Sequence, residues 1–573
     1  MVTNKYITRI ASVIMAAAVI LCLMASLFSD KLQEVYGNNA VTMKYESKLF
    51  NTDQIMDIDI LMDEDDWNNM LKNAISEEYY SCNVVVNGKT FYSVGIRPKG
   101  NTSLSSIVND PDTDRYSFKL EFDHYIEGQT CYGLDKLILN NNYADATNMK
   151  EAIVYDMYQY LGVDASLYNY AKISVNGDYR GVYLALEAVE DSFMLRNYGT
   201  EDGNLYKPES MGIGGGVDGN GFPQKGEMPD GEDFPQKGEM PDGEDFPQKG
   251  EMPDGEDFPQ MGEAPNGEAA DIKMGIMGGN GGADLNYTDD DLDSYSTIWD
   301  GEITDTDKKD HKRVVEALKN ISEGTDLETY MDVDNILKYM AVHTFVVNDD
   351  SLSGTMAHNY YLYEYNGKLN ILPWDYNLSF GGMSMGGKMG GQSLGATSVI
   401  NDAIDTPFSI TDFFDALLEN EEYLEQYHGY LNELVEKYVN GGEFEKTYER
   451  IRSQIDDLVG NDPTAFYSYE EYEEAANMLI EVVQLRAKSV SGQLAGTIPS
   501  TDEGQQQDSS NLIDGSDIDL SVMGSFSGGG GGNEGQGKDN GFAGTPQPFD
   551  AGDVSPISEE KADLQDSNQD SVK

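Results

Sequence analysis

A repeat rich in proline and glycine divides the chain and limits what it can fold into. From Phe222 the unit FPQKGEMPDGED recurs with a period of 12 residues and ends in a degenerate copy, FPQMGEAPNGEA. Proline and glycine in every unit exclude a continuous helix or a regular strand ladder, and the scarcity of aliphatic residues excludes a stacked solenoid. We therefore expect residues 209–284 to be a disordered acidic insertion. A Ca²⁺-binding repeat is the alternative, although the units lack the dense Asp/Asn spacing of known Ca²⁺ loops.

The sequence on either side of this insertion has the composition of a folded domain. Residues 43–208 mix strand and helix patterns, and residues 285–496 become strongly helical toward their end. The tail, 497–573, is rich in Gly, Ser, Asp and Gln and is predicted to be disordered. The folded part is then about 370 residues, which is the size of one large domain or two interleaved ones.

The N-terminal segment, residues 1–31, indicates the compartment. An apolar run from Ile10 to Phe28 follows Lys5 and Arg9, so it is long enough to span a bilayer and has a positively charged flank. A cleaved signal peptide is the alternative to a membrane anchor. Either way, we expect the rest of the chain to lie outside the cytoplasm.

The net charge limits the binding partners of this protein, and the cysteine count limits its disulfides. The net charge is −64, from 102 acidic and 38 basic residues, so binding to nucleic acid is disfavoured and cationic partners are favoured. The chain has three cysteines, too few for a disulfide framework. Cys82 and Cys131 form either one bridge or two separate buried thiols.

The segment Asn348 to Gly382 has the pattern of an active site. A helical run ends at Asn348-Asp349-Asp350-Ser351, and two alternating strands follow, joined by Asn366-Gly367, a strong hairpin signal. Pro373-Trp374-Asp375 comes directly after the second strand. Two acidic sites are thus separated by a hairpin.

A basic glycine loop lies upstream of these acidic sites. A first hairpin around Asn87-Gly88 leads into the sequence RPKGNTS, which contains Arg97, Lys99, Gly100 and Asn101. A glycine there lets the backbone approach a phosphate, and the basic side chains would donate hydrogen bonds to its oxygens. An ordinary turn at the end of a strand is the alternative.

A lysine and two glutamates complete the set of candidate site residues. Lys119 lies in the middle of the alternating strand YSFKLEF, and Glu151 lies in the second turn of a helix predicted from Ala146 to Leu161, with Asp145 as its N-cap. Glu187 ends the second strand of a hairpin around Asn176-Gly177 and is the expected neighbour of an adenine ring. The alternative for Lys119 and Glu151 is that they lie on solvent-exposed faces of the strand and the helix and have no functional role. In protein kinases the parts follow the order Gly loop, strand lysine, helix glutamate, catalytic Asp, hairpin and metal-binding Asp.

The motifs also resemble a known family. GIRPKGNTS, LNNNYADATNMKEAIVYDMYQYLG, VNGDYRGVYLALE, NDDSLSGTMAHNYYLY and LPWDYNLSFGG occur in the order found in the CotH family of secreted and spore-coat proteins. The resemblance runs from about Asp57 to about Gly496. It implies an atypical protein kinase that uses ATP and Mg²⁺ or Mn²⁺. We therefore predict an α+β, two-lobed, kinase-like fold with a β-rich N-lobe and a helical C-lobe.

The resemblance also implies roles for individual residues. The family pattern Asn-x-Asp-Ser selects Asp350 as the residue that orients the acceptor hydroxyl. Asp375 would ligate the metal, with Asn359 as a further oxygen donor. Asn377 stands where many members have a second acid, which puts a further carboxylate ligand in doubt. Lys150 replaces an arginine of the family pattern and so loses bidentate geometry.

Two functions follow from these observations. The first is an extracytoplasmic or spore-coat kinase that transfers the γ-phosphoryl group of ATP to Ser or Thr of a basic, Ser-rich, repetitive protein. The alternative is a non-catalytic surface or coat assembly protein whose acidic repeats recruit partners. Glycan hydrolysis is disfavoured, because no pair of carboxylates across a sugar cleft is indicated.

Overall fold

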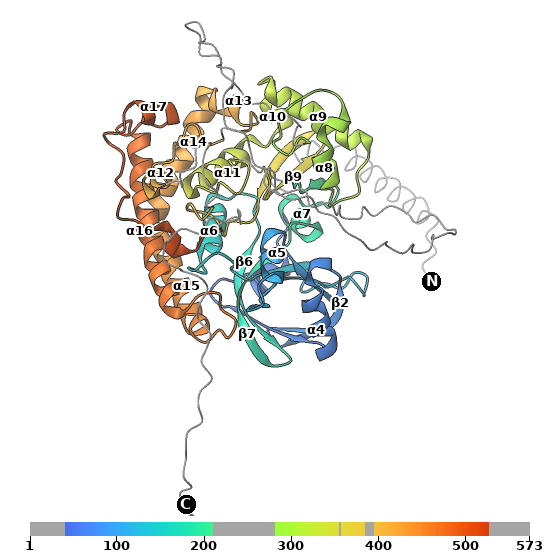
Figure 1. Cartoon of the computed structure of the whole chain (residues 1–573). Coiled ribbons are helices and arrows are strands. Elements are labelled where there is room, and N and C mark those ends of the chain that lie inside the picture. The colour runs from blue at the N-terminus through green and yellow to red at the C-terminus, as the bar shows by residue number, and fades with distance from the viewer. Residues whose placement is uncertain (1–39, 210–280, 355–356, 384–394, 409, 527–573) are drawn as a thin grey trace, which may run out of the picture.

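Seven strands form a closed barrel at one end of the molecule (Figure 1). The computed structural model describes residues 40–209, 281–354, 357–383, 395–408 and 410–526. The barrel order is β1-β2-β3-β4-β5-β7-β6. Its strands are β1 (Met56–Leu61), β2 (Tyr80–Val86), β3 (Lys89–Lys99), β4 (Ser117–Glu121), β5 (Lys136–Asn140), β6 (Tyr168–Val175) and β7 (Asp178–Glu187).

Three Asn-Gly turns make the local hairpins, as the sequence predicts. Asn87, Asn176 and Asn366 have φ of 49°, 52° and 54°, and the glycine after each also has positive φ. This backbone gives the two-residue turn whose twist matches that of antiparallel strands. The hairpins β2-β3, β6-β7 and β9-β10 are therefore confirmed.

The two-lobed, kinase-like fold predicted above is wrong, although the α+β class is confirmed. β1 pairs antiparallel with β2 and parallel with β6, from Met56↔Ala171 to Ile60↔Val175, and this parallel pair closes the barrel. The C-terminal part is also not purely helical. It shares a three-stranded sheet, in the order β10-β9-β8, with β8 (Asn204–Tyr206) from the other side of the insertion. Alternating periodicity predicts strands, but it does not fix which strands pair over long distances.

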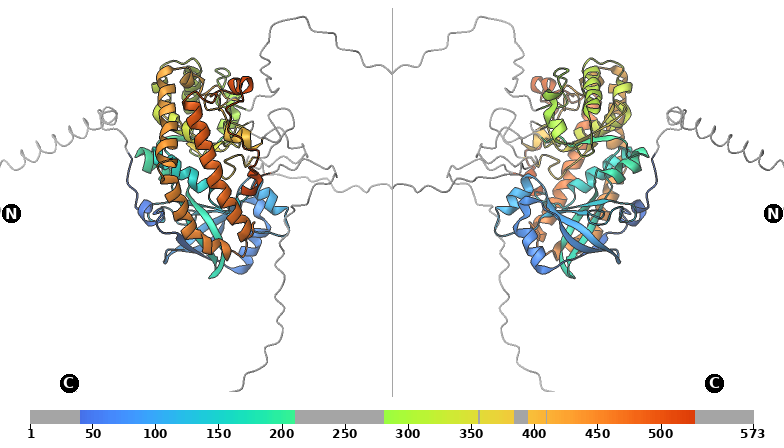
Figure 2. Two further views of the ribbon diagram at one scale, coloured as in Figure 1. Left: turned by 90° about the vertical axis from the view of Figure 1, so that its left-hand side faces the viewer. Right: turned by 90° about the vertical axis from the view of Figure 1, so that its right-hand side faces the viewer.

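Helices cover the barrel and the small sheet, whose other strands are β9 (Tyr360–Tyr365) and β10 (Lys368–Pro373). The two longest helices, α15 (Glu443–Gly460) and α16 (Tyr469–Leu494), run along one side of the molecule (Figures 1 and 2). α15 also contacts β7 of the barrel. The helical character predicted for the end of residues 285–496 is confirmed.

The remaining helices are shorter. In the first part of the chain they are α3 (Lys44–Lys48), α4 (Glu64–Lys72), η1 (Ala74–Ser76), α5 (Thr102–Val108), α6 (Lys150–Leu161) and α7 (Asp191–Tyr198). After the insertion they are η2 (Leu292–Tyr295), α8 (Ser296–Asp300), α9 (Lys308–Ser322), α10 (Leu327–Tyr330), α11 (Val333–Val346), α12 (Ala396–Ile400), α13 (Asp415–Leu418), α14 (Glu421–Glu433), η3 (Leu434–Val439), α17 (Asp502–Gln507) and η4 (Leu520–Met523).

The helix α6 begins four residues later than the sequence predicts and ends at Leu161, as predicted. Met149 is its N-cap, while the carboxylate of Asp145 accepts hydrogen bonds from the backbone N–H groups of Thr147 and Lys150. Asp145 therefore anchors the loop before the helix. Gly162 ends the helix with φ of 73°, a conformation that costs glycine little.

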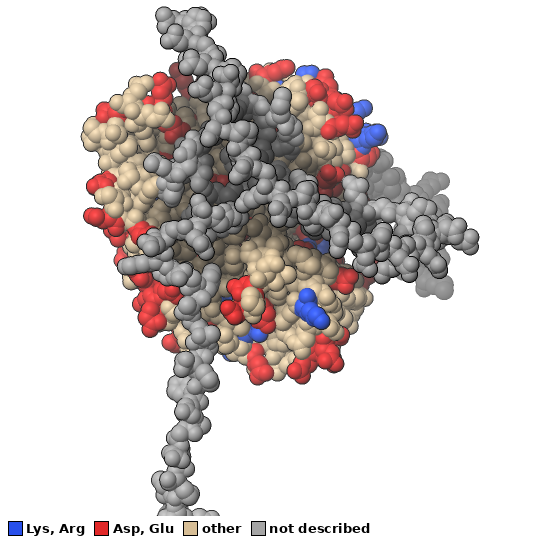
Figure 3. All heavy atoms as spheres, in the orientation of Figure 1, with Lys and Arg blue, Asp and Glu red and all other residues tan. Residues whose placement is uncertain are grey.

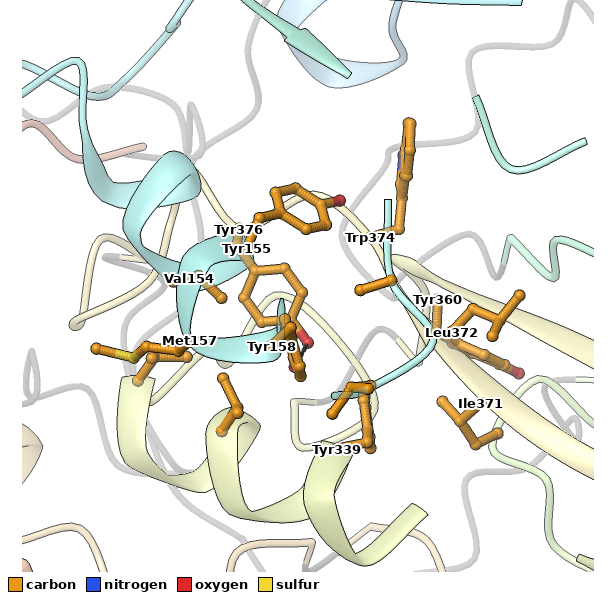
Figure 4. Packing of buried hydrophobic residues seen from close by; sticks show 14 of the residues in the cluster. Val154, Tyr155, Met157, Tyr158, Tyr339, Tyr360, Ile371, Leu372, Trp374 and Tyr376 are labelled. Atoms are coloured by element: carbon orange, nitrogen blue, oxygen red, sulfur yellow. Dashed lines mark hydrogen bonds between the residues drawn. The ribbon is translucent and has the colours of Figure 1, made fainter. Parts of the chain in front are cut away.

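Two hydrophobic clusters stabilise the fold. One consists mainly of the inward side chains of the barrel strands together with α4 and α5. The other lies where α6, α11, α14 and α16 pack against one another and against the small sheet. Figure 4 shows part of this second cluster, in which tyrosines from α6 and α11 pack near Tyr376, while Trp374 lies apart from them near the end of β10.

The first thirty residues of the predicted disordered tail are folded. Residues 497–526 include α17 and η4, and Ile498 and Met523 are buried. Phe526 donates its backbone N–H to the carbonyl of Gly382, and the carbonyl of Met523 accepts from Ala146. The prediction of disorder is therefore wrong for this stretch, which packs against the loop before α6.

Several predictions fall on residues outside the described ranges. These are the N-terminal apolar run, the 12-residue repeats and the tail from 527. Within the ranges that the structure describes, no helix is long and apolar enough to cross a membrane.

Cys82 and Cys131 are both buried and form no disulfide, so the alternative of two separate buried thiols is confirmed. Acidic side chains outnumber basic ones on the face drawn in Figure 3.

Candidate active site

The two acidic loops predicted to carry the chemistry lie close together. Asp350 is in the loop after α11, and Asp375 lies two residues after the end of β10. Burial raises the pKa of Asp375, the negative charge of Asp350 raises it further, and the cation of Lys99 opposes both effects. Asp375 has a left-handed backbone with φ of 61°, which non-glycine residues adopt only where the surroundings hold them.

Asp350 is held by two neighbours from the start of the following strand. Its carboxylate lies 2.7 Å from Nε2 of His358 and accepts a 3.0 Å hydrogen bond from Nδ2 of Asn359. The same amide donates to the backbone carbonyl of Asp350 at 2.8 Å. Asp350 is only 8% exposed, so these contacts fix a carboxylate that faces the site from a nearly buried position.

Lys99, the last residue of β3, supplies a cation to this carboxylate pair. Its Nζ donates to Oδ1 of Asn140 at 3.2 Å and lies 5.4 Å from the ring centroid of Trp374. Burial lowers the pKa of Lys99, whereas the carboxylates of Asp375 and Glu151 raise it. An ammonium enclosed in this way is suited to binding an anion that enters the site.

Glu151, in the first turn of α6, completes the arrangement. Nδ2 of Asn140 donates to its Oε2 at 2.9 Å, so the single Asn140 side chain bridges Lys99 and Glu151. Glu151 is 4% exposed. Burial and the charge of Asp375 raise its pKa to about 8, against the lowering effects of Asn140 and Lys99.

A second lysine reaches the same region from the end of β8. Lys207 lowers the pKa of Asp375 and lies 6.0 Å from the ring centroid of Tyr361. It also forms an ion pair with Glu209. The site therefore draws residues from the barrel, from α6 and from the small sheet.

The structure does not bring the other predicted nucleotide-binding residues to this cluster. Lys119 in β4 pairs with Glu190, which also binds Lys136. The carboxylate of Glu187 is fully buried and is used by Arg196, Tyr45 and the N–H of Leu167. Both side chains are therefore engaged away from the acidic loops, whereas Lys99 lies beside Asp375 and Glu151.

Only one residue of the predicted basic glycine loop, Lys99, belongs to the site. Arg97 forms an ion pair with Glu77 and not with the acidic loops. Gly100 has φ of 132°, and a Cβ there would lie 2.9 Å from Oγ of Ser103, so the turn requires glycine. Asn101 precedes α5 without capping it through its side chain. Among the described residues of this loop, Lys99 is the one that interacts with Asp375.

Three residues of the site were missed by the sequence reasoning: Asn140, Lys207 and His358. His358 is one of only five histidines and directly precedes Asn359, which was a usable signal. Lys207 and Asn140 carried no comparable signal, because each lies at the end of a strand whose spatial neighbours the sequence does not define.

The donor set fits a cation that is shared with a bound phosphate. Asp375 and the amide of Asn359 offer oxygen donors, and the charge of Asp350 raises the pKa of Asp375, an effect that a cation beside Asp375 would offset. Mg²⁺ commonly uses one or two carboxylates together with waters and substrate phosphates. Among the residues described, no group of three or more His, Cys, Asp or Glu side chains would hold an ion alone.

A comparison with protein families gives an independent assignment. The model of the family described as CotH kinase protein matches residues 96–490, a range that contains all the site residues above. No curated protein sequence matches the chain. Because the family model covers most of the chain, this protein belongs to the CotH family.

Proposed function

We propose that this protein is a metal-dependent protein kinase that transfers the γ-phosphoryl group of ATP to Ser or Thr of a protein substrate. The observation that carries the proposal is the convergence of Lys99, Glu151 and Asp375 on one another, with Asp350 beside them. A lysine, a glutamate and two separate aspartates are the groups that phosphoryl transfer requires for positioning and charge stabilisation. The kinase name of the family supports the same activity.

The residues around Asp375 would bind the nucleotide. Asp375 and Asn359 would hold Mg²⁺ or Mn²⁺, and the ion, when bound, would offset the negative charge of the phosphates. Lys99 would donate to a phosphate oxygen. Asn140 and Glu151 would keep Lys99 in position, because Asn140 is hydrogen-bonded to both.

Asp350 would accept the proton of the substrate hydroxyl or orient it for attack. His358 and Asn359 each contact one oxygen of its carboxylate, which leaves further lone pairs for a hydroxyl donor. This role differs from that of Asp375, since Asp350 would contact the acceptor and not the nucleotide.

Charge supports a basic, Ser-rich protein as the acceptor. The chain has a net charge of −64, so cationic substrates would be attracted and nucleic acid repelled. The apolar N-terminal run supports a location outside the cytoplasm, through a membrane anchor or secretion, and the family supports the spore coat as one such place.

Calorimetry with ATP, with and without Mg²⁺, tests the proposal at the binding step. We expect binding by the wild type only with the metal, none by Asp375→Ala, and nearly unchanged binding by Asp350→Ala. Asp349→Ala is the matched control for Asp350, because it is the adjacent acid in the same loop. A folded wild type that binds no ATP in either condition would support the alternative function, a non-catalytic assembly protein.

A further inference from the structure

A chain of buried hydrogen bonds connects the two acidic loops beneath the site. Tyr158 of α6 and Tyr376, the residue after Asp375, have hydroxyl oxygens 2.5 Å apart. Oη of Tyr376 lies 3.0 Å from Nδ1 of His343 in α11, and Nε2 of His343 lies 2.8 Å from Oγ of Ser353. Ser353 donates in turn to the backbone carbonyl of Asn348 at 2.8 Å, two residues before Asp350.

The direction of every hydrogen bond in this chain follows from its last member. A carbonyl only accepts, so the hydroxyl hydrogen of Ser353 is used by Asn348. Nε2 of His343 must therefore donate to Ser353, and its unprotonated Nδ1 accepts the hydrogen of Tyr376. Tyr158 then donates to Tyr376. Each donor is used once, and the histidine is the neutral Nε2–H tautomer.

Burial supports the same assignment. Tyr158 and Tyr376 are fully buried and His343 is 1% exposed. Burial lowers the pKa of His343 to about 3, so the ring is neutral at physiological pH, as the directed chain requires. A buried hydroxyl or ring nitrogen that loses its partner is costly, so this chain has one favoured arrangement.

The packing around Tyr376 gives the chain a fixed attachment to Asp375. Figure 4 shows Tyr376 beside Tyr155 and Tyr158, in the packed layer between α6 and α11. The ring of Tyr376 meets that of Tyr158 edge to face, with centroids 5.4 Å apart. Asp375 has a left-handed backbone, which non-glycine residues adopt only where the surroundings hold them, and Tyr376 is its anchored neighbour.

We propose that Tyr376 is a positioning residue whose hydroxyl, through His343 and Ser353, keeps the Asp350 loop aligned with the Asp375 loop. This inference rests on the proposed function, because alignment of the two loops matters only if both act on one reaction. It assigns to the residue after the metal-binding position a role beyond packing. Tyr376 would touch neither substrate nor nucleotide.

The test compares Tyr376→Phe with Tyr155→Phe. Both changes remove one buried tyrosine hydroxyl from the same cluster, but the hydroxyl of Tyr155 has no hydrogen-bond partner among the described residues. For Tyr376→Phe we expect faster amide hydrogen exchange in residues 348–354, a fall of about 10- to 100-fold in kcat for transfer, and a Kd for Mg²⁺-ATP within about threefold of wild type. Tyr155→Phe should change none of the three.

A second variant tests the chain itself. Ser353→Ala removes the hydroxyl that joins His343 to Asn348 at the other end of the hydrogen-bonded chain. The double variant with Tyr376→Phe should transfer phosphate no more slowly than the slower single variant, because both substitutions break the same hydrogen-bonded chain. Unchanged exchange in residues 348–354, equal effects of Tyr155→Phe, or multiplicative losses in the double variant would each overturn the proposal. If the wild type transfers no phosphate, the proposed function fails, and the exchange data alone then decide whether Tyr376 positions the Asp350 loop.

Discussion

Glu151 gives the sharpest prediction about stability, because its carboxyl group is buried beside another acid. Burial and the charge of Asp375 raise its pKa from 4.5 to about 8. The folded state therefore binds a proton at Glu151 more tightly than the unfolded state does. The wild type should lose stability as the pH rises from about 4.5 to about 8, because the unfolded chain releases this proton in that range while the folded form retains it.

Replacing Glu151 by Gln removes this dependence and keeps the shape. The difference between 4.5 and about 8 corresponds to about 5 kcal/mol at most, at about 1.4 kcal/mol for each pKa unit. Lys99 and Asp375 titrate together with Glu151, so we expect roughly half of that amount. The amide can still accept the hydrogen bond from Nδ2 of Asn140 through its oxygen.

Thermal unfolding of the nucleotide-free protein at pH 5.5, 7.0 and 8.5 measures the effect. Because 1 kcal/mol moves Tm by about 2–4 °C in domains of 150–250 residues and by less in larger ones, Glu151→Gln should gain a few degrees over wild type at pH 8.5. The gain should fall to about a third of that value at pH 5.5, because the carboxyl group of the unfolded chain, with a pKa of 4.5, is already mostly ionised there. Glu316→Gln, an exposed change on α9, is the control. A gain of the same size at every pH would refute the reasoning.

Two further predictions concern the fold. Asp462→Ala should lower the free energy of unfolding by about 3–5 kcal/mol, because it leaves the buried guanidinium of Arg115 without its 2.8 Å ion pair. Asp114→Ala, which removes the more exposed ion pair with Arg180, is the control. An equal loss of stability in the two variants would contradict this prediction. Cys82 and Cys131 should resist a thiol reagent at pH 8 in the native protein and react in urea, because burial raises the pKa of each thiol to about 12. Rapid labelling of either of these two thiols in the native protein would contradict this prediction.

Local features were predicted from the sequence, and long-range pairing was not. The hairpins at Asn87, Asn176 and Asn366 follow from turn chemistry that acts within a few residues. Closure of the barrel depends on β1 pairing with β6, more than a hundred residues away, which no local pattern specifies. The two-lobed prediction was wrong for that reason.

The site was predicted in part for the same reason. Asp350, Asp375 and Glu151 were selected by motif and do converge, and of the two lysines predicted to bind nucleotide only Lys99 lies with them. Lys99 and Lys119 both lie on strands with alternating side chains, and only the neighbours of each strand distinguish them. Lys119 faces Glu190, while Lys99 at the end of β3 faces the acidic loops.

Transfer of radiolabelled γ-phosphate from ATP to a Ser-, Lys- and Arg-rich peptide tests the central claim most directly. With Mg²⁺, the wild type should label the peptide, Asp375→Ala should not, and Asp350→Ala should be slower by about 10²- to 10⁴-fold, the usual effect of losing a general base or positioning group. Chelation of the metal should stop the reaction in the wild type. Labelling by both alanine variants at the wild-type rate would contradict the assignment of the reaction to these two carboxylates.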